Sequence, residues 1–278
     1  MGKRVILISG VSSGLGKAFA VAAMAAGHTV IGTVRSEAAK AEFERLDPQR
    51  AHGVLLDVTD FAAVAPAIEA AARRVGAVDV LINNAGYGHE GTLEESPLDE
   101  LVRQFEVNVF GSVAMIKAVL PSMRERRTGH IFNITSMAGH VALPGISYYA
   151  GSKFALEGIS ESLEQEVRGF GIKVTAIAPG SFRTDWAGRS MVRSERSIAD
   201  YDAMFGPVRE ARAAKDGKQA GDPLKAAQAM LDLLDHPQPP AHLLLGRDAL
   251  HLVRVRASSL SDAIDAWEPV TKSTDFQQ

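Results

Sequence analysis

Short, fully apolar runs alternate along this chain with longer stretches whose apolar residues recur at helical spacing. The runs predict strands at residues 5–8, 29–34, 53–56, 78–82, 130–135, 172–178 and 241–245. The stretches predict helices at residues 14–26, 60–75, 98–127, 147–170 and 223–234, the third of them divided near Gly111. Strands that are apolar on both faces and separated by helices are typical of a parallel sheet covered on both sides. We therefore expect an α/β fold with a doubly wound parallel sheet of about seven strands.

The 278 residues, 46% hydrophobic and 23% charged, suit a single domain spanning residues 1–278. Within it, residues 181–221 form a polar, Arg-rich stretch, and residues 247–278 predict a final helix and a frayed tail. Thr59 or Asp60 is the expected cap of helix 60–75, and Pro66 is expected to delay its start or kink it.

The net charge and the absence of cysteine limit which partners and which cellular compartment are expected for this protein. A formal net charge of -3 gives no general attraction to nucleic acid or to anionic membranes. The absence of cysteine excludes disulfides, thiolate metal sites and a Cys nucleophile, and is compatible with a reducing cytoplasm. The apolar run at residues 5–8 is too short for a signal peptide, and we expect no membrane span, no metal site and a cytoplasmic protein.

A glycine-rich loop follows the first predicted strand. Residues 9–16 read Ser-Gly-Val-Ser-Ser-Gly-Leu-Gly and open the next helix. Glycines let a backbone approach a pyrophosphate, and a helix start offers free N–H groups with a favourable dipole. The alternative is a plain strand-to-helix turn.

Four further elements follow later strands in order, namely Asn83-Asn84-Ala85-Gly86, Ser136, Tyr149-x-x-x-Lys153 and Pro179-Gly180. Together with the glycine loop, they resemble the signature of the short-chain dehydrogenase/reductase family, over residues 4 to about 185. Relatives usually have Thr where this chain has Ser9. The resemblance implies a Rossmann fold, a nicotinamide dinucleotide and an oxidoreductase of the 250–280-residue type.

Tyr149 and Lys153 share one helix face, because they are four residues apart. Tyr148 is offset by about 100° and has Ser152 as its fourth neighbour. A phenol has a pKa of about 10, and a nearby ammonium lowers it, so Tyr149 could exchange a proton with an alcohol or carbonyl oxygen. An amphipathic helix with an incidental Tyr and Lys is the alternative. Tyr148 is expected to pack or to line the pocket edge.

The remaining catalytic roles come from the resemblance. It implies that Ser136 holds the substrate oxygen, that Lys153 also binds the nicotinamide ribose, and that Asn108 supports a water-linked proton relay. Asn108 could instead be a buried polar residue that satisfies the backbone.

Cofactor choice depends on the end of the second strand, which reads Val34-Arg35 without a carboxylate. Arg35 could pair with a 2′-phosphate, or could be an exposed Arg at a strand end. NADP is favoured on the charge of Arg35. NAD remains possible, because the second basic residue that many NADP-using relatives carry is replaced by Ser13 here. The resemblance places Asp57 and Val58 at the adenine, although Asp57 could cap a helix. The expected cofactor contacts are Gly10, Ser12, Ser13, Gly14, Leu15, Gly16, Arg35, Asp57, Val58, Asn84, Ala85, Gly86, Tyr149, Lys153, Pro179, Gly180 and Thr184.

Residues 181–221 occupy the place of the substrate lid in the family, where Thr184 matches a contact to the nicotinamide carboxamide. The lid's arginines could receive an anionic substrate, but a solvated face is favoured: Arg183, Arg189, Arg193, Arg196, Arg209 and Arg212. Its large apolar residues could form a pocket wall or pack on the sheet: Trp186, Met191, Tyr201, Met204 and Phe205. His89 and His140 are expected to be solvated in loops, although His140 could border the cleft.

The expected function is an NADP(H)-preferring oxidoreductase that interconverts a small-molecule carbonyl and a secondary alcohol. One alternative is a 3-oxoacyl-type reductase, although Gly246-Arg247-Asp248 replaces the usual Gly-Gly ending. Another is a catalytically silent dinucleotide-sensing protein, which should have lost part of the signature. The helices at 108–127 and 147–170 match those through which relatives assemble, so a homodimer or homotetramer is expected.

Overall fold

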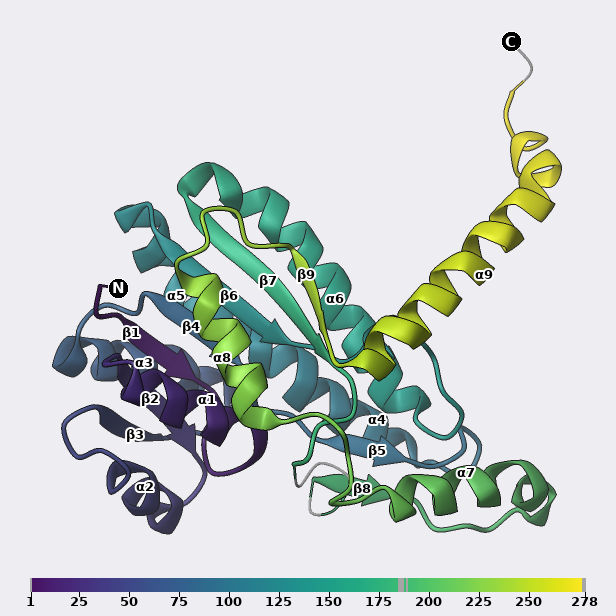
Figure 1. Ribbon diagram of the computed structural model, residues 1–278, viewed down its shortest axis with the longest axis horizontal. Coiled ribbons are helices and arrows are strands. Elements are labelled where there is room, and N and C mark those ends of the chain that lie inside the picture. The colour runs from purple at the N-terminus through teal and green to yellow at the C-terminus, as the bar shows by residue number, and fades with distance from the viewer. Residues whose placement is uncertain (1, 185–187, 189, 277–278) are drawn as a thin grey trace.

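A parallel sheet of seven strands forms the centre of the computed structural model, which describes residues 2–184, 188 and 190–276 (Figure 1). The strand order is β3-β2-β1-β4-β6-β7-β9, and every neighbouring pair is parallel. The strands are β1 (Val5–Ile8), β2 (Thr29–Val34), β3 (Ala51–Leu55), β4 (Val80–Asn83), β6 (Gly129–Ile134), β7 (Ile172–Pro179) and β9 (His242–Leu245). The predicted doubly wound sheet is confirmed.

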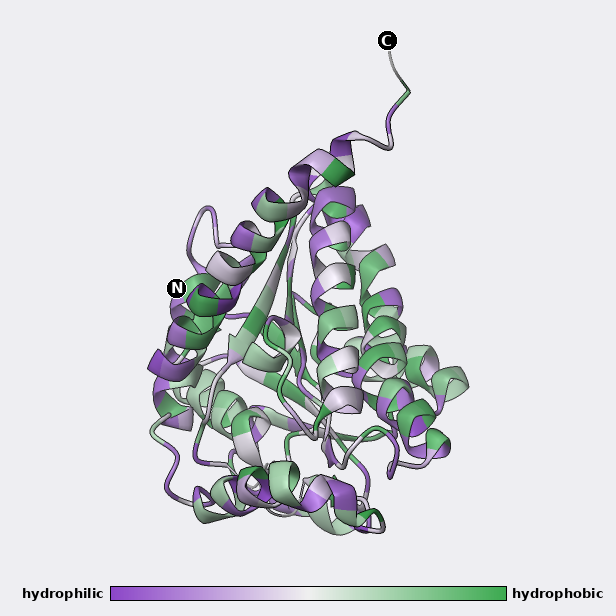
Figure 2. Cartoon of the chain, turned by 90° about the vertical axis from the view of Figure 1, so that its right-hand side faces the viewer, coloured by the Kyte–Doolittle hydropathy of each residue, from purple (hydrophilic) through white to green (hydrophobic). Residues whose placement is uncertain are grey.

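Helices cover both faces of the sheet, as Figure 2 shows edge on. One face carries α1 (Gly14–Ala25) and α8 (Pro223–Leu234), and the other carries α3 (Phe61–Val75), α5 (Gly111–Arg126) and α6 (Ser147–Val167). Alternate strand residues supply the two cores, so Ile6 and Ile8 face α1 while Leu7 faces α3 and α5. Full burial of each such side chain stabilises the fold by roughly 1.5–3 kcal/mol.

The strand order reverses between β1 and β4, which pair directly at Ile8 and Ile82. Connections leave these two strands toward opposite edges, and a crevice forms between the loops that follow them. The glycine loop after β1 and the Asn84 loop after β4 therefore begin side by side.

Several element boundaries differ from the sequence prediction. Helix α2 (Glu37–Glu44) was not predicted; Ser36 caps it by accepting a hydrogen bond from Ala39 N, and Phe43 anchors it in the core. Strand β3 starts at Ala51 rather than 53, because it pairs with β2 from Val30 onward. Helix α3 continues through Pro66 and is capped by Asp60.

The predicted helix 98–127 is divided where expected. Helix α4 (Leu98–Phe105) and α5 are joined by a π-helical turn at Glu106–Phe110. By length and hydropathy alone, Leu98–Arg126 could cross a membrane, contrary to the expectation that no run approaches a span. Its apolar residues Met115 and Val119 instead pack on the sheet.

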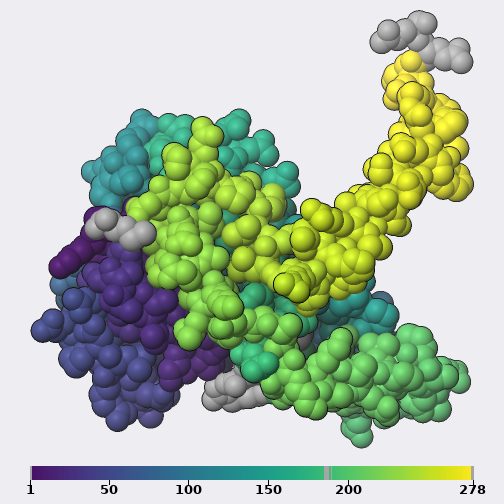
Figure 3. Space-filling view, viewed as in Figure 1, coloured from purple at the N-terminus to yellow at the C-terminus, as the bar shows by residue number. Residues whose placement is uncertain are grey.

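The segment after residue 181 is more regular than predicted. Strand β8 (Met191–Arg193) pairs with β5 (Gly88–Glu90) in a small parallel sheet, and α7 (Asp202–Ala214) follows. Helix α9 (Arg247–Lys272) is the expected final helix, and it extends away from the body of the protein (Figures 1 and 3).

Candidate active site

The glycine loop is locked to the loop after β4. The Asn84 side-chain amide donates hydrogen bonds to the carbonyls of Ser9 and Gly10, at 3.0 and 2.8 Å. A Cβ at Gly16 would overlap both the Gly10 carbonyl and the Asn84 amide, so only glycine fits there. Gly14 has φ 58°, a left-handed backbone conformation.

Ser9 joins the same two loops from the other direction. Its hydroxyl accepts hydrogen bonds from the backbone N–H groups of Asn84 and Ala85, both at 2.9 Å. A hydroxyl at this position is sufficient for both bonds, so the replacement of the family's usual Thr by Ser keeps the connection.

The start of α1 is suited to an anionic ligand. Ser13 is its N-cap but makes no side-chain capping hydrogen bond, and no acidic residue lies in the first turn. By contrast, Ser36 and Asp60 cap α2 and α3 with their side chains. The first N–H groups of a helix have no partner within it, so the loop and helix start fit a pyrophosphate.

Tyr149 and Lys153 lie together on α6, and both are buried. Lys153 Nζ is 5.7 Å from the centroid of the Tyr149 ring and donates a hydrogen bond to the Ile134 carbonyl at 2.9 Å. It also lies beside Gly86, where an added Cβ would be 3.7 Å from Nζ. Lys153 thus joins α6, the end of β6 and the loop after β4.

Burial lowers the pKa of Lys153 to about 8, although the nearby Glu157 carboxylate raises it. The ammonium is therefore the dominant form below about pH 8. An ammonium held beside a phenol favours the phenolate, which is the electrostatic requirement for Tyr149 to act as an acid and base.

Ser136 follows β6 and begins a 3-10 turn at Met137–Gly139. Its hydroxyl accepts a hydrogen bond from Ala138 N at 3.0 Å, which fixes the side chain at the turn. Gly139 in this turn packs against α6, where an added Cβ would be 2.9 Å from the Lys153 carbonyl. The turn that carries Ser136 is therefore seated on the part of α6 that carries Lys153.

Asn108 lies fully buried in the π-helical turn. Its Oδ1 accepts a hydrogen bond from Tyr87 N, and its Nδ2 donates to the Tyr87 carbonyl and to Ser152 Oγ, at 3.1, 3.1 and 3.0 Å. These contacts satisfy buried backbone, as the structural alternative expected. Asn108 also lies beside Gly86, as Lys153 does, which keeps it close to the expected site. Its role in a proton relay stays a prediction.

Tyr148 is buried, and both its hydroxyl and its ring make packing contacts. Its hydroxyl donates to the Ser96 carbonyl at 2.8 Å, and its ring stacks on His89 with 5.1 Å between centroids. His89 is itself buried and bonded to Ser194 Oγ, so the expectation of a solvated His89 was wrong.

The residues expected at the adenosine end are only partly brought together. Arg35 lies exposed just after β2. Burial raises the pKa of Asp57, but hydrogen bonds from Thr59 and the charges of Arg35 and Arg103 outweigh it and lower the pKa. Asp57 accepts these bonds within a turn and does not cap α3. The Val58 side chain packs against Gly111 of α5.

Asp248, in the first turn of α9, holds the loop after β7 and was missed from the sequence. Its carboxylate accepts a hydrogen bond from Ser181 N at 2.8 Å, and a Cβ at Gly180 would overlap it. Thr184 then lies against Gly14, with 3.7 Å between the Thr184 Cβ and an added Gly14 Cβ. In the sequence, Asp248 could have been recognised by the departure from the family's Gly-Gly ending at residues 246–248.

Four of the described lid arginines form ion pairs with buried carboxylates, which corrects the interpretation of a solvated face for these four. Arg212 reaches the Glu90 carboxylate at 2.7 Å, and Arg193 and Arg209 reach it at 3.4 Å. The Glu90 side chain is only 2% exposed. Arg196 binds the buried Glu95 at 3.1 Å. The lid is therefore fastened by ion pairs to the segment that follows β4.

The apolar lid residues divide between core and surface. Phe205 and Met191 are buried, and Phe205 packs against Gly145, where a Cβ would overlap its ring. Met204 is 53% exposed, and Tyr201 donates a hydrogen bond to Glu94. Trp186 and Arg189 lie outside the described residues.

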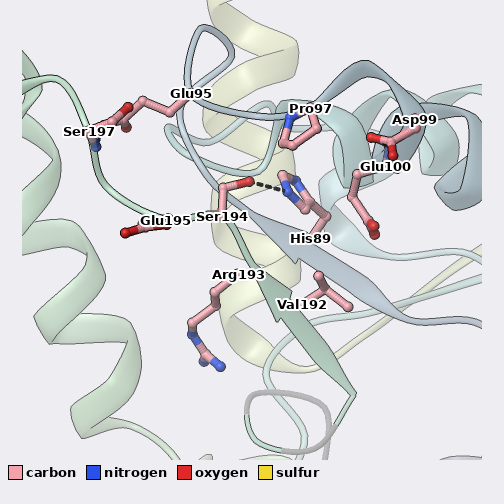
Figure 4. A pocket seen from close by; sticks show the side chains of 10 residues that line it. All are labelled: His89, Glu95, Pro97, Asp99, Glu100, Val192, Arg193, Ser194, Glu195 and Ser197. Atoms are coloured by element: carbon pink, nitrogen blue, oxygen red, sulfur yellow. Dashed lines mark hydrogen bonds between the residues drawn. The ribbon is translucent and has the colours of Figure 1, made fainter.

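A cavity of about 440 Å³ lies between β5, β8 and the start of α4 (Figure 4). His89, Val192 and Ser194 form part of its wall, and Glu100 lies across from them. Ser136, Tyr149 and Lys153 do not line it. His89, which lines the cavity, stacks on Tyr148 of α6.

Three residues distant in sequence meet at α6, which carries Glu157. Glu157 accepts hydrogen bonds from Thr135 Oγ1 and from His242 Nδ1, and lies 3.1 Å from His140 Nε2. This contact raises the pKa of His140. The ligand atoms of His140, Glu157 and His242 could hold a metal ion, which sequence spacing did not predict. One carboxylate oxygen of Glu157 is bonded to Thr135 and the other to His242. His140 is therefore not a solvated loop residue.

Comparison with known proteins identifies the class. Residues 4–193 match the family described as short chain dehydrogenase. The chain is 38% identical to the oxidoreductase BOA17 of Botryotinia fuckeliana, over 96% of this chain and 98% of that protein. The chain therefore belongs to the short-chain dehydrogenase/reductase family and is an NAD(P)-dependent oxidoreductase.

Two further relatives carry more specific names. A 3-ketodihydrosphingosine reductase of Bacteroides thetaiotaomicron is 37% identical over 88% of this chain and 89% of its own length. An NADPH-dependent 3-dehydrocapnine reductase of Ornithobacterium rhinotracheale is 34% identical over 75% of this chain and 76% of its own length.

Solved structures share the fold. A short-chain dehydrogenase from Streptomyces avermitilis has a TM-score of 0.92 and 40% identity over 99% of both chains. A Burkholderia phymatum family member in complex with NAD has a TM-score of 0.81 and 25% identity, covering 93% and 94%. ElxO with NADP bound has a TM-score of 0.73 and 25% identity, covering 87% and 96%. A nicotinamide dinucleotide cofactor is thus supported for this chain.

Proposed function

We propose that this protein is an NADP(H)-preferring oxidoreductase that interconverts a carbonyl and a secondary alcohol, with Tyr149 as general acid and base. The observation that carries the proposal is the buried pair on α6, in which the Lys153 ammonium lies 5.7 Å from the Tyr149 ring centroid. Family membership supports a dinucleotide-dependent reaction, and the glycine loop supplies a fitting cradle.

Each protein group has a separate task in this reaction. The loop at residues 10–16, with Asn84, Ala85, Gly86, Pro179, Gly180 and Thr184, holds the dinucleotide. The bound nicotinamide supplies the hydride for reduction and accepts it in oxidation. Ser136 Oγ holds the substrate oxygen, and the Tyr149 hydroxyl gives it a proton on reduction and removes one on oxidation. Lys153 keeps positive charge beside the phenol and binds the ribose hydroxyls, and Asn108 supports resupply of the proton.

The preference for NADP rests on Arg35. Neither Val34 nor Arg35 at the end of β2 is a carboxylate, and the Arg35 guanidinium can form a charge-assisted pair with a 2′-phosphate. A relative named as NADPH-dependent adds support. A carboxylate at this position would instead bind the ribose hydroxyls of NAD and repel the phosphate.

A 3-oxoacyl-type reductase is the second candidate function. Two relatives support it, because they are named for reduction of a 3-keto or a 3-dehydro compound. These names make 3-keto compounds the first substrates to test. A silent, dinucleotide-sensing protein is disfavoured because Ser136, Tyr149 and Lys153 are all present. We also propose a cytoplasmic homodimer or homotetramer.

The direct test is a substrate panel with the purified protein. Ketones and secondary alcohols, including 3-keto compounds with short and long chains, are offered with NADPH, NADH, NADP and NAD, and products are identified by mass spectrometry. We expect reduction of a ketone with a higher kcat/KM for NADPH than for NADH. No turnover of any member, or equal use of both reduced cofactors, would contradict the activity or the Arg35 argument respectively.

A further inference from the structure

Helix α9 leaves the body of the protein after its first turns and extends into solvent (Figures 1 and 3). It has 26 residues, and Ala249 is its only buried member among the described residues. From Arg254 to Phe276, every residue is exposed. A helix without tertiary contacts is of marginal stability in water, so a partner that covers α9 would stabilise it.

One face of α9 is an apolar stripe with the spacing of a coiled coil. The stripe consists of residues at intervals of alternately four and three positions: Val253, Ala257, Leu260, Ile264 and Trp267. Leu260, Ile264 and Trp267 are 46%, 60% and 65% exposed. Large apolar residues repeated at this spacing form the seam along which two helices pack.

Charges beside the stripe fit a second copy of the same helix. Arg254 and Arg256 lie in the first half of α9, and Asp262, Asp265 and Glu268 lie in the second half together with Lys272. Arg254, Ser261 and Glu268 are seven residues apart and therefore lie along one flank of the stripe. In an antiparallel pair, this flank meets its own copy with Arg254 opposite Glu268 of the partner subunit. In a parallel pair, this flank would face the other flank, formed by residues 249, 256 and 263, where neither Arg254 nor Glu268 meets an opposite charge.

We infer that α9 is a self-association helix, which pairs antiparallel with α9 of a second copy of this chain along the Val253–Trp267 stripe. The pairing is symmetric about Leu260 and Ser261, so the same patch serves both protomers, as a twofold axis requires. The acidic second half of α9 argues against an anionic membrane surface as the occupant. This surface is separate from the helices at 108–127 and 147–170, through which relatives assemble.

The first test compares two substitutions of equal charge on opposite faces. Leu260→Glu lies in the stripe, whereas Val255→Glu lies on the opposite side at 55% exposure. We expect light scattering to show half the wild-type mass for Leu260→Glu, with a dissociation constant at least about a hundredfold higher. The mass of Val255→Glu should equal that of the wild type. A monomeric wild type, or equal behaviour of the two variants, would overturn the proposal.

The second test does not depend on the folding of a charged variant. The chain contains no cysteine, so single thiols can be placed without background. Ser261→Cys faces the partner in the proposed pair, and Ser259→Cys, two positions away, faces outward. A short thiol-to-thiol cross-linker should give a covalent dimer with Ser261→Cys and not with Ser259→Cys. The same yield from both would overturn the proposal.

Orientation is tested with thiols near the two ends of the stripe. In the antiparallel pair, two copies of residue 267 are roughly 18 Å apart along the axis, given a rise of about 1.5 Å per residue. Trp267→Cys alone should therefore not cross-link, but a mixture of Trp267→Cys and Val253→Cys should. Cross-linking of Trp267→Cys with itself would exclude the antiparallel arrangement. Binding of a monomeric wild type to phosphatidylserine vesicles would assign the stripe to a membrane instead.

Discussion

The loops at the carboxyl edge of the sheet and the lid that faces them are held in place by different forces. The edge loops are joined by hydrogen bonds between side chains and backbone at Ser9 and Asn84, and by glycines such as Gly16 that allow close approach. The lid is fastened by ion pairs on Glu90 and Glu95. Edge geometry therefore follows from the sheet, whereas lid position depends on a few side chains.

This difference predicts which kinetic constant each region controls. Changes at the edge should alter kcat or the choice of cofactor, because they act on groups at the reacting centre. Changes in the lid should alter substrate affinity, because they leave those groups in place. Four substitutions examine the comparison, in order of expected effect.

Lys153→Met should have the largest effect. Loss of the ammonium beside Tyr149 removes the charge that favours the phenolate, and we expect kcat to fall by about 10²–10⁴. Steady-state kinetics with saturating NADPH checks this. Wild-type kcat/KM should also fall as pH rises through about 8, because the Lys153 pKa is lowered to about 8 and the ammonium is lost above it. A profile that stays flat well above this pH would contradict the role of Lys153.

Arg35→Ser should lower the ratio of kcat/KM for NADPH to that for NADH by roughly 10–100-fold, the value of a charge-assisted contact. Activity with NADH should change little, because NADH has no 2′-phosphate. Arg35→Lys should keep part of the preference. An unchanged ratio in Arg35→Ser would contradict the proposal that Arg35 determines a preference for NADPH.

Glu90→Gln should act mainly on the lid. Three guanidinium groups lose a charged partner that is 2% exposed, so we expect KM for the substrate to rise about tenfold with kcat nearly unchanged. Hydrogen exchange at residues 191–214 should become faster. The matched control is Glu94→Gln, in the turn after β5, where an amide replaces an exposed carboxylate and can still accept the Tyr201 hydrogen bond, so both measurements should stay near wild type. A large fall in kcat with unchanged KM would contradict the comparison.

His140→Asn should have the smallest effect, on stability alone. The bond to Glu157 raises the pKa of His140, so its contribution is complete below the usual value of 6.5 and is lost as pH rises through the raised value. Burial raises the Glu157 pKa, but the bonds from His140 and Thr135 outweigh it. That contribution is complete above 4.5 and is lost on acidification. The free energy of unfolding should therefore fall by about 1–2 kcal/mol, most clearly between these two values.

Chemical denaturation at several pH values measures this difference. His251→Asn is the control, because His251 is exposed on α9. A loss that is the same at acidic, neutral and alkaline pH would show that His140 contributes through packing rather than through its charge.

The sheet and its edge could be predicted because local patterns determine them. An apolar run such as residues 5–8 has no other low-energy place than the middle of a covered sheet, and a helix period puts Tyr149 and Lys153 on one face. The parallel order then brings Gly10 beside Asn84. The strands and the shared helix face need only residue spacing, whereas the choice of Asn84 and Ser136 as site residues came from the family resemblance.

The lid and the Glu157 cluster could not be predicted because they depend on long-range pairing. Glu90 and Arg212 are 122 residues apart, and Glu157 and His242 are 85 apart. Charged residues in a polar stretch are usually solvated, so nothing local distinguishes Arg212 from an exposed arginine. Helix α2 was missed for a different reason: it is eight residues long and only Phe43 reaches the core.

The most direct test of the proposed mechanism compares the two adjacent tyrosines. Tyr149→Phe and Tyr148→Phe are each measured for NADPH binding at equilibrium and for hydride transfer in a single turnover. We predict that Tyr149→Phe binds NADPH normally but transfers hydride at least about a hundredfold more slowly, whereas Tyr148→Phe, which loses one bond to Ser96, stays near wild type. Normal hydride transfer in Tyr149→Phe, or its loss in Tyr148→Phe, would contradict the proposed role of Tyr149.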